Sequence, residues 1–104
     1  MITIDANRLL TDRKYRILLN EYHSLIAYIA ADLNRYITVQ SAGVNFHNTS
    51  DLYEVKNELI EMLKETFPLF DIYMEKYGEH YELDEDEFRI CVSWKNYRDN
   101  KKID

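Results

Sequence analysis

The sequence is poor in glycine, proline and cysteine, with two glycines, one proline and one cysteine among 104 residues. Loops that bind phosphate need clustered glycines so that backbone amides can approach the ligand, and Gly43 and Gly78 are far apart. The single Cys91 excludes an intramolecular disulfide and a zinc site built from paired cysteines. Because a lone cysteine fits a reducing compartment most easily, we predict a cytoplasmic protein.

Long apolar runs are also lacking, and no stretch approaches the length that a bilayer-spanning helix needs. The first ten residues have no apolar core after a basic segment, so we expect neither an export signal nor membrane insertion. The length fits a single domain, which we place at residues 1–95. Residues 96–104 have no apolar period and are expected to form a polar tail.

The strongest pattern lies at residues 14–36 and predicts a long helix. The stretch contains no glycine or proline, and Thr11 and Asp12 before it supply oxygens that can cap a helix start. Apolar residues recur three and four positions apart, which places them on one stripe facing the core. The stripe consists of Leu18, Tyr22, Leu25, Ile29, Leu33 and Tyr36.

A second apolar set widens the surface of this helix and consists of Tyr15, Leu19, Ile26 and Ile37. The combined surface is broader than the band of an ordinary surface helix, so the helix needs two partners. We predict that Tyr15, Leu19 and Ile26 contact another copy of the chain in a homo-oligomer, a dimer in the simplest case. The alternative is that they belong to the scattered exposed apolar residues of most soluble proteins.

Two shorter elements flank the long helix. Asp5 is a suitable cap for a short helix whose Leu9 and Leu10 would pack under the long one, although a short strand is the alternative here. A first strand follows, either at residues 37–40 or at residues 43–47, where the leading glycine suggests a bulge or a tight bend.

A second helix is expected from Asp51, whose spacing to Glu54 is that of a capping box, up to Pro68. Its predicted buried face consists of Leu52, Val55, Leu59, Met62, Leu63 and Phe67. Residues 70–75 and 88–95 then alternate between apolar and other side chains, as the two strands of an antiparallel hairpin do.

These elements predict an α+β domain of α-β-α-β-β layout. A strand, crossover helix and strand form a right-handed unit, which makes the first two strands parallel. The third strand should pair antiparallel with the second. We therefore expect a three-stranded mixed sheet with two helices packed on one face and the other face left to water or a partner.

The net charge of −6 belongs to the second half of the chain. Residues 1–50 contain five Lys/Arg and four Asp/Glu, whereas residues 51–104 contain eight and fifteen, which gives +1 and −7. Much of the acidity lies in the connection of the predicted hairpin, where it would repel phosphate backbones, so direct nucleic-acid binding is not expected.

The hairpin is the predicted protein-binding surface, since it combines carboxylates with aromatic rings that are enriched at interfaces. Carboxylates on a rigid hairpin can also imitate nucleic-acid phosphates and occupy a basic groove of another protein. The alternatives are a solvated turn, a Ca²⁺ site without the usual glycine, and tyrosines that merely alternate on a half-exposed sheet. The predicted binding residues are Tyr77, His80, Tyr81, Asp84, Glu85, Asp86 and Glu87.

Catalytic and metal-binding patterns are not found in the sequence. His23, His47 and His80 lack the spacing that brings two imidazoles to one metal ion. Cys91 lies in the middle of a predicted strand and is interpreted as a packing residue. We expect no enzymatic activity, no cofactor and no metal.

A few basic residues on the long helix suggest a different kind of site. Arg13, Arg16 and Arg35 could serve as phosphate partners if the protein traps a small anion, such as a nucleotide signal, between subunits. A solvated basic face is the alternative interpretation.

Several short motifs resemble a set of small proteins of tailed bacteriophages. They are an opening Ala-x-x-Leu segment at Ala6–Thr11, the paired Ala30 and Ala31, Leu63 followed by Lys64, and a closing Val-Ser-Trp at Val92–Trp94. The resemblance implies a viral origin and a role in redirecting or disabling host machinery. It implies no site residue.

From these observations we predict a non-enzymatic phage-type protein of the host cytoplasm. It would bind and inhibit or redirect a host protein of defence or nucleic-acid handling through its acidic, tyrosine-rich hairpin. The alternatives are an oligomeric protein that sequesters a small anionic ligand, and a structural or assembly protein.

Overall fold

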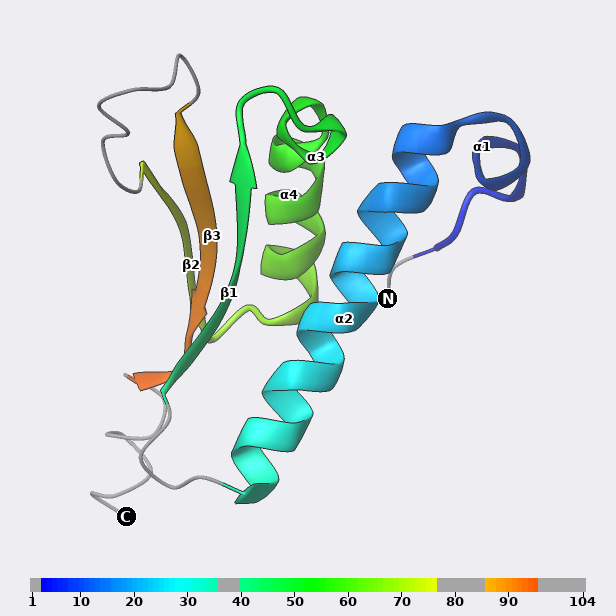
Figure 1. The fold of residues 1–104 in the computed structure, drawn as a ribbon. Coiled ribbons are helices and arrows are strands. Elements are labelled where there is room, and N and C mark those ends of the chain that lie inside the picture. The colour runs from blue at the N-terminus through cyan, green and yellow to red at the C-terminus, as the bar shows by residue number, and fades with distance from the viewer. Residues whose placement is uncertain (1–2, 36–39, 77–85, 96–104) are drawn as a thin grey trace.

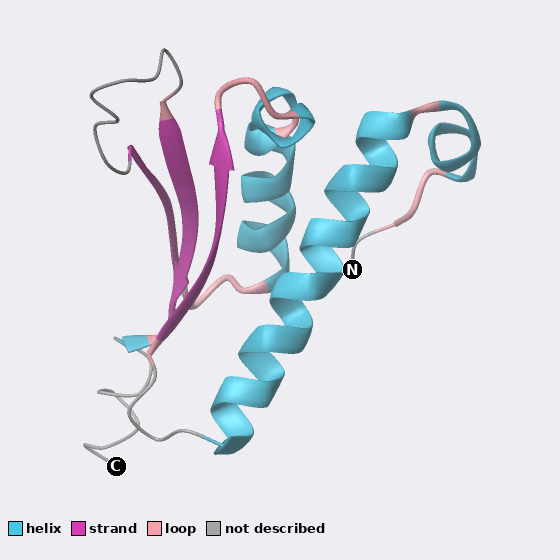
Figure 2. Cartoon of the chain, in the orientation of Figure 1, coloured by secondary structure: helices cyan, strands magenta, loops and turns pink. Residues whose placement is uncertain are grey.

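The computed structural model describes residues 3–35, 40–76 and 86–95 (Figure 1). Within them the chain forms helices and strands in an α+β arrangement, in which α2 and α4 lie on the same side of one sheet (Figures 1 and 2). This confirms the predicted fold class and the two helices. The elements are α1 (Ala6–Thr11), α2 (Arg13–Arg35), β1 (Ser41–His47), α3 (Asp51–Glu54), α4 (Lys56–Thr66), β2 (Asp71–Lys76) and β3 (Glu87–Ser93).

The helices α1 and α2 begin at aspartate caps. The Asp5 side chain accepts a hydrogen bond from the Arg8 amide, as predicted, and Asp12 Oδ1 accepts one from the Lys14 amide at 3.0 Å. However, Leu9 and Leu10 are 37% and 79% exposed, so the prediction that they pack under α2 is wrong. The reason is that α1 lies beyond the end of α2 that is farther from the sheet (Figure 1).

The predicted second helix is divided into α3 and α4 at Val55, whose ψ of 12° departs from helical geometry. Ser50, one residue before the predicted cap, accepts the hydrogen bond from the Leu52 amide at 3.2 Å. The predicted buried face is otherwise confirmed, and α4 ends at Thr66, just before Phe67 and Pro68.

The sheet has the order β1-β3-β2, and both of its hydrogen-bonded pairs are antiparallel. β1 and β2 therefore run in the same direction, as predicted, but they are not neighbours because β3 lies between them. The expected mixed sheet is wrong in this respect. β1 begins at Ser41, in agreement with the later of the two predicted positions, while residues 36–39 lie outside the described part of the chain.

The core lies between the inner face of the sheet and the helices α2, α3 and α4. Tyr15 and Leu19 belong to this core, with only 4% and 6% exposed. They do not form the exposed surface that an oligomer contact requires, because the chain's own elements cover them. Ile26 is half-buried against the same core, and Leu33, expected to face the core, is 45% exposed.

Candidate protein-binding face of the sheet

The sheet has a second face that no described helix covers, and we call it the outer face (Figure 2). Alternation along the strands and the register of the ladders place its side chains in rows that cross all the strands. One row joins Gly43, Cys91 and Tyr73, and the next joins Asn45, Arg89 and Glu75. The outer face consists of Ser41, Gly43, Asn45, Asp71, Tyr73, Glu75, Arg89, Cys91 and Ser93.

Gly43 lies beneath the side chain of Arg89 in the middle of this face. A Cβ at Gly43 would lie 2.6 Å from Arg89 Nε and 2.8 Å from the Ile90 carbonyl oxygen. The ladder is continuous through Gly43, so the bulge or bend suggested by the sequence is not present. The glycine instead provides room for Arg89 to lie flat over the strand.

Cys91 is covered by this arrangement and is only 5% exposed, in agreement with its predicted packing role. Burial raises the pKa of the Cys91 thiol above its ordinary value, and the nearby Glu75 carboxylate raises this pKa further. Desolvation also raises the pKa of the Tyr73 hydroxyl. The Cys91 thiol and the Tyr73 hydroxyl are therefore protonated and uncharged at neutral pH, so this part of the outer face is neutral.

The strand β2 is the most exposed part of the sheet, since five of its six residues are exposed. Tyr73 on the outer face is 42% exposed, and Met74, on the apolar side of the alternation at residues 70–75, is 37% exposed. Only Ile72 is half-buried on this strand. β2 is also an edge strand, because its only partner in the described sheet is β3. No strand of the described sheet pairs with its other side, as is typical of an edge strand.

The acidic end of the sheet lies where the predicted hairpin connection begins. Asp86 approaches Lys76, with Oδ2 3.4 Å from Nζ, and its carbonyl oxygen accepts a hydrogen bond from the Asn48 amide at 3.0 Å. Glu87 opposes His47 in the ladder of β1 and β3. The structure thus places two of the predicted binding residues beside the end of β2. The others, Tyr77, His80, Tyr81, Asp84 and Glu85, lie outside the described residues.

The predicted anion-binding arginines are not brought together within the chain. Arg13 forms a 2.9 Å salt bridge with Asp51, and Arg16 donates a 2.9 Å hydrogen bond to the Leu9 carbonyl oxygen. Arg35 is the last residue of α2, about 33 Å along the helix from Arg13 at 1.5 Å per residue. Within the described part of the chain, the backbone of α2 thus places Arg35 far from Arg13 and Arg16.

Throughout residues 3–35, 40–76 and 86–95, no cluster of three or more His, Cys, Asp or Glu side chains has an arrangement that could hold a metal ion. Over the same ranges, no helix combines the length and apolarity needed to cross a membrane.

Comparisons with known proteins give no relative for this chain. It matches no protein-family model, no curated protein and no solved structure. The functional argument therefore depends on the residues and geometry of the chain itself.

Proposed function

We propose that this protein is a non-enzymatic binding protein whose edge strand β2 pairs with an extended, basic segment of a partner protein. The observation that carries the proposal is the exposure of β2, an edge strand that presents Tyr73 and Glu75. Strand addition at a sheet edge gives affinity through main-chain hydrogen bonds, and side chains on alternate positions give specificity.

The charge of the edge determines which segment can pair with it. Asp71 and Glu75 are acidic residues of β2, and Asp86 and Glu87 lie at the adjoining end of the sheet. Like charges directly opposite each other destabilise a ladder, whereas opposite charges stabilise it. Two of the three charged residues of β2 are acidic, and the third, Lys76, is already paired with Asp86, so a partner segment rich in Lys or Arg is favoured.

The resemblance to phage proteins suggests where such a partner would be found. In our proposal the partner is a bacterial host protein, and binding takes place in the host cytoplasm, where Cys91 stays reduced. Occupation of a basic segment of the host protein would inhibit or redirect it. The tyrosine-rich connection between β2 and β3 would extend the same contact.

The test compares tagged variants as baits in a bacterial lysate, with the bound proteins identified by mass spectrometry and then purified for direct titration. Tyr73→Ala and Glu75→Lys should each weaken capture of the specific partner about tenfold or more, because they remove an aromatic contact and an opposite charge. Binding by the wild type should fall with added salt.

A matched control is Glu61→Lys, which makes the same charge change at an exposed position of α4. This variant should capture the partner as well as the wild type does. If Glu61→Lys and Glu75→Lys weaken binding equally, only net charge matters and the β2 interface is wrong. A partner whose affinity is unchanged by all three substitutions would also overturn it.

A further inference from the structure

The short helix α1 is attached to the rest of the protein mainly through polar contacts. None of its six residues is buried, and its two leucines are exposed. Its contacts with α2 and α4 include the side chain of Arg8, which reaches Glu58, and the carbonyl of Leu9, which accepts a hydrogen bond from Arg16. A helix without buried apolar residues is held weakly, so the contact made by Arg8 is central to its position.

Arg8 is bound by Glu58 and Tyr15 as a guanidinium ligand would be. Its Nη1 and Nη2 donate to the two carboxylate oxygens of Glu58 at 2.6 and 3.2 Å. Its Cζ lies 4.2 Å from the centre of the Tyr15 ring. A bidentate carboxylate together with an aromatic face is the combination that selects a planar guanidinium over an ammonium group.

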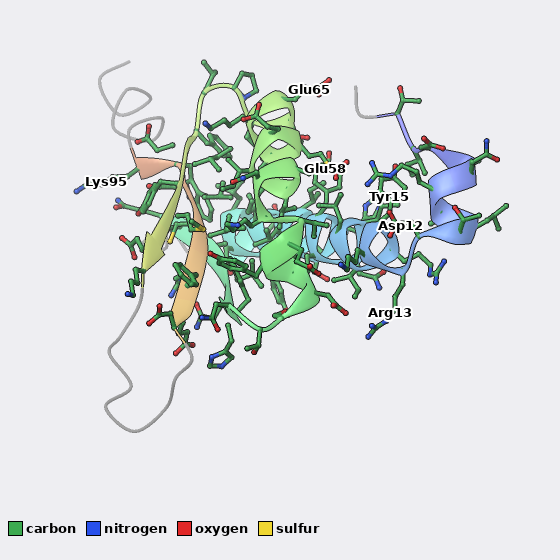
Figure 3. All side chains as sticks on the ribbon, turned by 90° about the horizontal axis from the view of Figure 1, so that it is seen from above. Asp12, Arg13, Tyr15, Glu58, Glu65 and Lys95 are labelled. Atoms are coloured by element: carbon green, nitrogen blue, oxygen red, sulfur yellow. The ribbon has the colours of Figure 1, made fainter. Side chains whose placement is uncertain are left out.

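The two recognition groups belong to the folded body of the protein, not to α1. Glu58 belongs to α4 and Tyr15 to α2. Figure 3 shows both residues on the side of α4 that faces α1. Tyr15 belongs to the buried core, which holds its ring in place independently of α1, and its hydroxyl also accepts a 2.9 Å hydrogen bond from the amide of Asp5, the cap of α1. The site would therefore keep its form if Arg8 were replaced by another guanidinium.

A cavity of about 330 Å³ opens at this point. Its volume is within the range of small-ligand sites, about 300–1,000 Å³. The aliphatic part of a long side chain could contact Met62, while Glu58 and Glu65 supply negative charge. The lining residues are Thr3, Asp5, Arg8, Tyr15, Glu58, Met62 and Glu65.

We propose that Tyr15 and Glu58 form an arginine-binding site that Arg8 occupies in cis, and that an arginine of a partner protein displaces it. This site is on the helical side of the molecule and is independent of the β2 edge. Since Arg8 is tethered beside the site, its effective concentration is high, and it weakens the binding of any competing arginine. Displacement would release α1, which connects arginine binding to a change of shape.

The first test uses Arg8→Ala, in which the site is vacated, and titrates it with N-acetyl-arginine-amide while the Tyr15 ring signals are followed by NMR. Binding should be saturable and about tenfold tighter than in the wild type, because the internal competitor is gone. The double variant Arg8→Ala/Glu58→Gln should bind about tenfold more weakly than Arg8→Ala, since a charge-assisted hydrogen bond is lost.

N-acetyl-lysine-amide is the matched control ligand and should bind Arg8→Ala about tenfold more weakly than the arginine compound. A folded Arg8→Ala that does not bind N-acetyl-arginine-amide overturns the proposal. Equal binding of the two compounds, or unchanged binding after Glu58→Gln, overturns it as well.

A second measurement uses the wild-type protein and does not depend on the folding of a variant. N-acetyl-arginine-amide should increase hydrogen exchange of the α1 amides in a concentration-dependent way, while amides of β3 remain protected. The lysine compound should have a smaller effect at the same concentration. Exchange in α1 that responds equally to both compounds, or to neither, contradicts displacement of Arg8.

Discussion

The side chain of Arg89 on β3 lies directly over Gly43 on β1, so close that a Cβ at Gly43 would be 2.6 Å from Arg89 Nε. The same Cβ would lie 2.8 Å from the Ile90 carbonyl oxygen, which belongs to the backbone of the central strand. Arg89 could change its rotamer, but the Ile90 carbonyl cannot move without disturbing the ladder. The pair explains why a glycine occupies the middle of β1.

Gly43→Ala should therefore destabilise the protein by about 1–3 kcal/mol, as overpacking does at a crowded site. The sign is informative, since alanine in place of a strand glycine is otherwise expected to stabilise. Urea denaturation followed by circular dichroism measures the change in the free energy of unfolding. Ser41→Ala, at an exposed position of the same strand and face, should change it by less than about 0.5 kcal/mol.

Tyr22 connects α2 to the end of α4 through a short hydrogen bond. Its hydroxyl lies 2.5 Å from Thr66 Oγ1, and Thr66 in turn donates to the Met62 carbonyl oxygen. Tyr22→Phe keeps the buried ring but removes this bond, so we expect a loss of about 0.5–1.5 kcal/mol in the free energy of unfolding. Tyr28→Phe is the control, because Tyr28 is 63% exposed and should be neutral. Equal effects of the two substitutions would contradict the role of the hydrogen bond.

Local pattern in the sequence predicted the helices well, while the order of the strands was missed. The 3.6-residue period and the aspartate caps determine α1 and α2, because they act within a few residues. Strand order depends on contacts between distant segments, and both strands of the hairpin have a similar alternation. One signal was available in the sequence, since Ile90, Cys91 and Val92 are three consecutive apolar residues, a run that is typical of a buried central strand, and all three are buried in the structure.

The candidate sites were less predictable for the same reason. The contact of Arg8 with Glu58 joins residues 50 positions apart, and no local spacing indicates it. The broad apolar surface of α2 was real, but it is explained largely by packing within one chain. Tyr15 and Leu19 are buried against the chain's own core, which the sequence alone could not distinguish from contact with a second copy.

Leu19 tests directly whether this surface of α2 packs within one chain or against a second copy. Leu19→Ala should destabilise the domain by about 2–5 kcal/mol, because a buried leucine loses contacts and leaves a cavity. Leu33→Ala should change the free energy of unfolding by less than about 0.5 kcal/mol, since Leu33 is 45% exposed on the same helix. Both are measured by urea denaturation at two protein concentrations. A Leu19→Ala midpoint that depends on concentration, with wild-type stability at high concentration, would instead restore Leu19 to an oligomer interface.

Cys91 gives the protein a pH dependence whose sign follows from its buried position. Burial raises the pKa of its thiol in the folded state above the ordinary value of 9.0, so the unfolded chain loses this proton at a lower pH than the folded protein does. The stability due to the protonated thiol is complete below pH 9.0 and is lost as the pH rises from there through the folded-state pKa. Urea denaturation at a series of pH values between neutral and alkaline should show this decline.

Cys91→Ala separates the thiol from the other groups that titrate in alkali. Its free energy of unfolding should be lower at neutral pH because a small buried side chain is truncated, but it should fall less steeply above pH 9.0 than that of the wild type. The desolvated Tyr73 hydroxyl acts in the same direction above its own ordinary pKa of 10.0, and Tyr73→Phe removes that contribution. If the wild type and Cys91→Ala decline in parallel, the thiol is not protonated preferentially in the folded state, and the close cover provided by Arg89 and Gly43 does not exclude water from it.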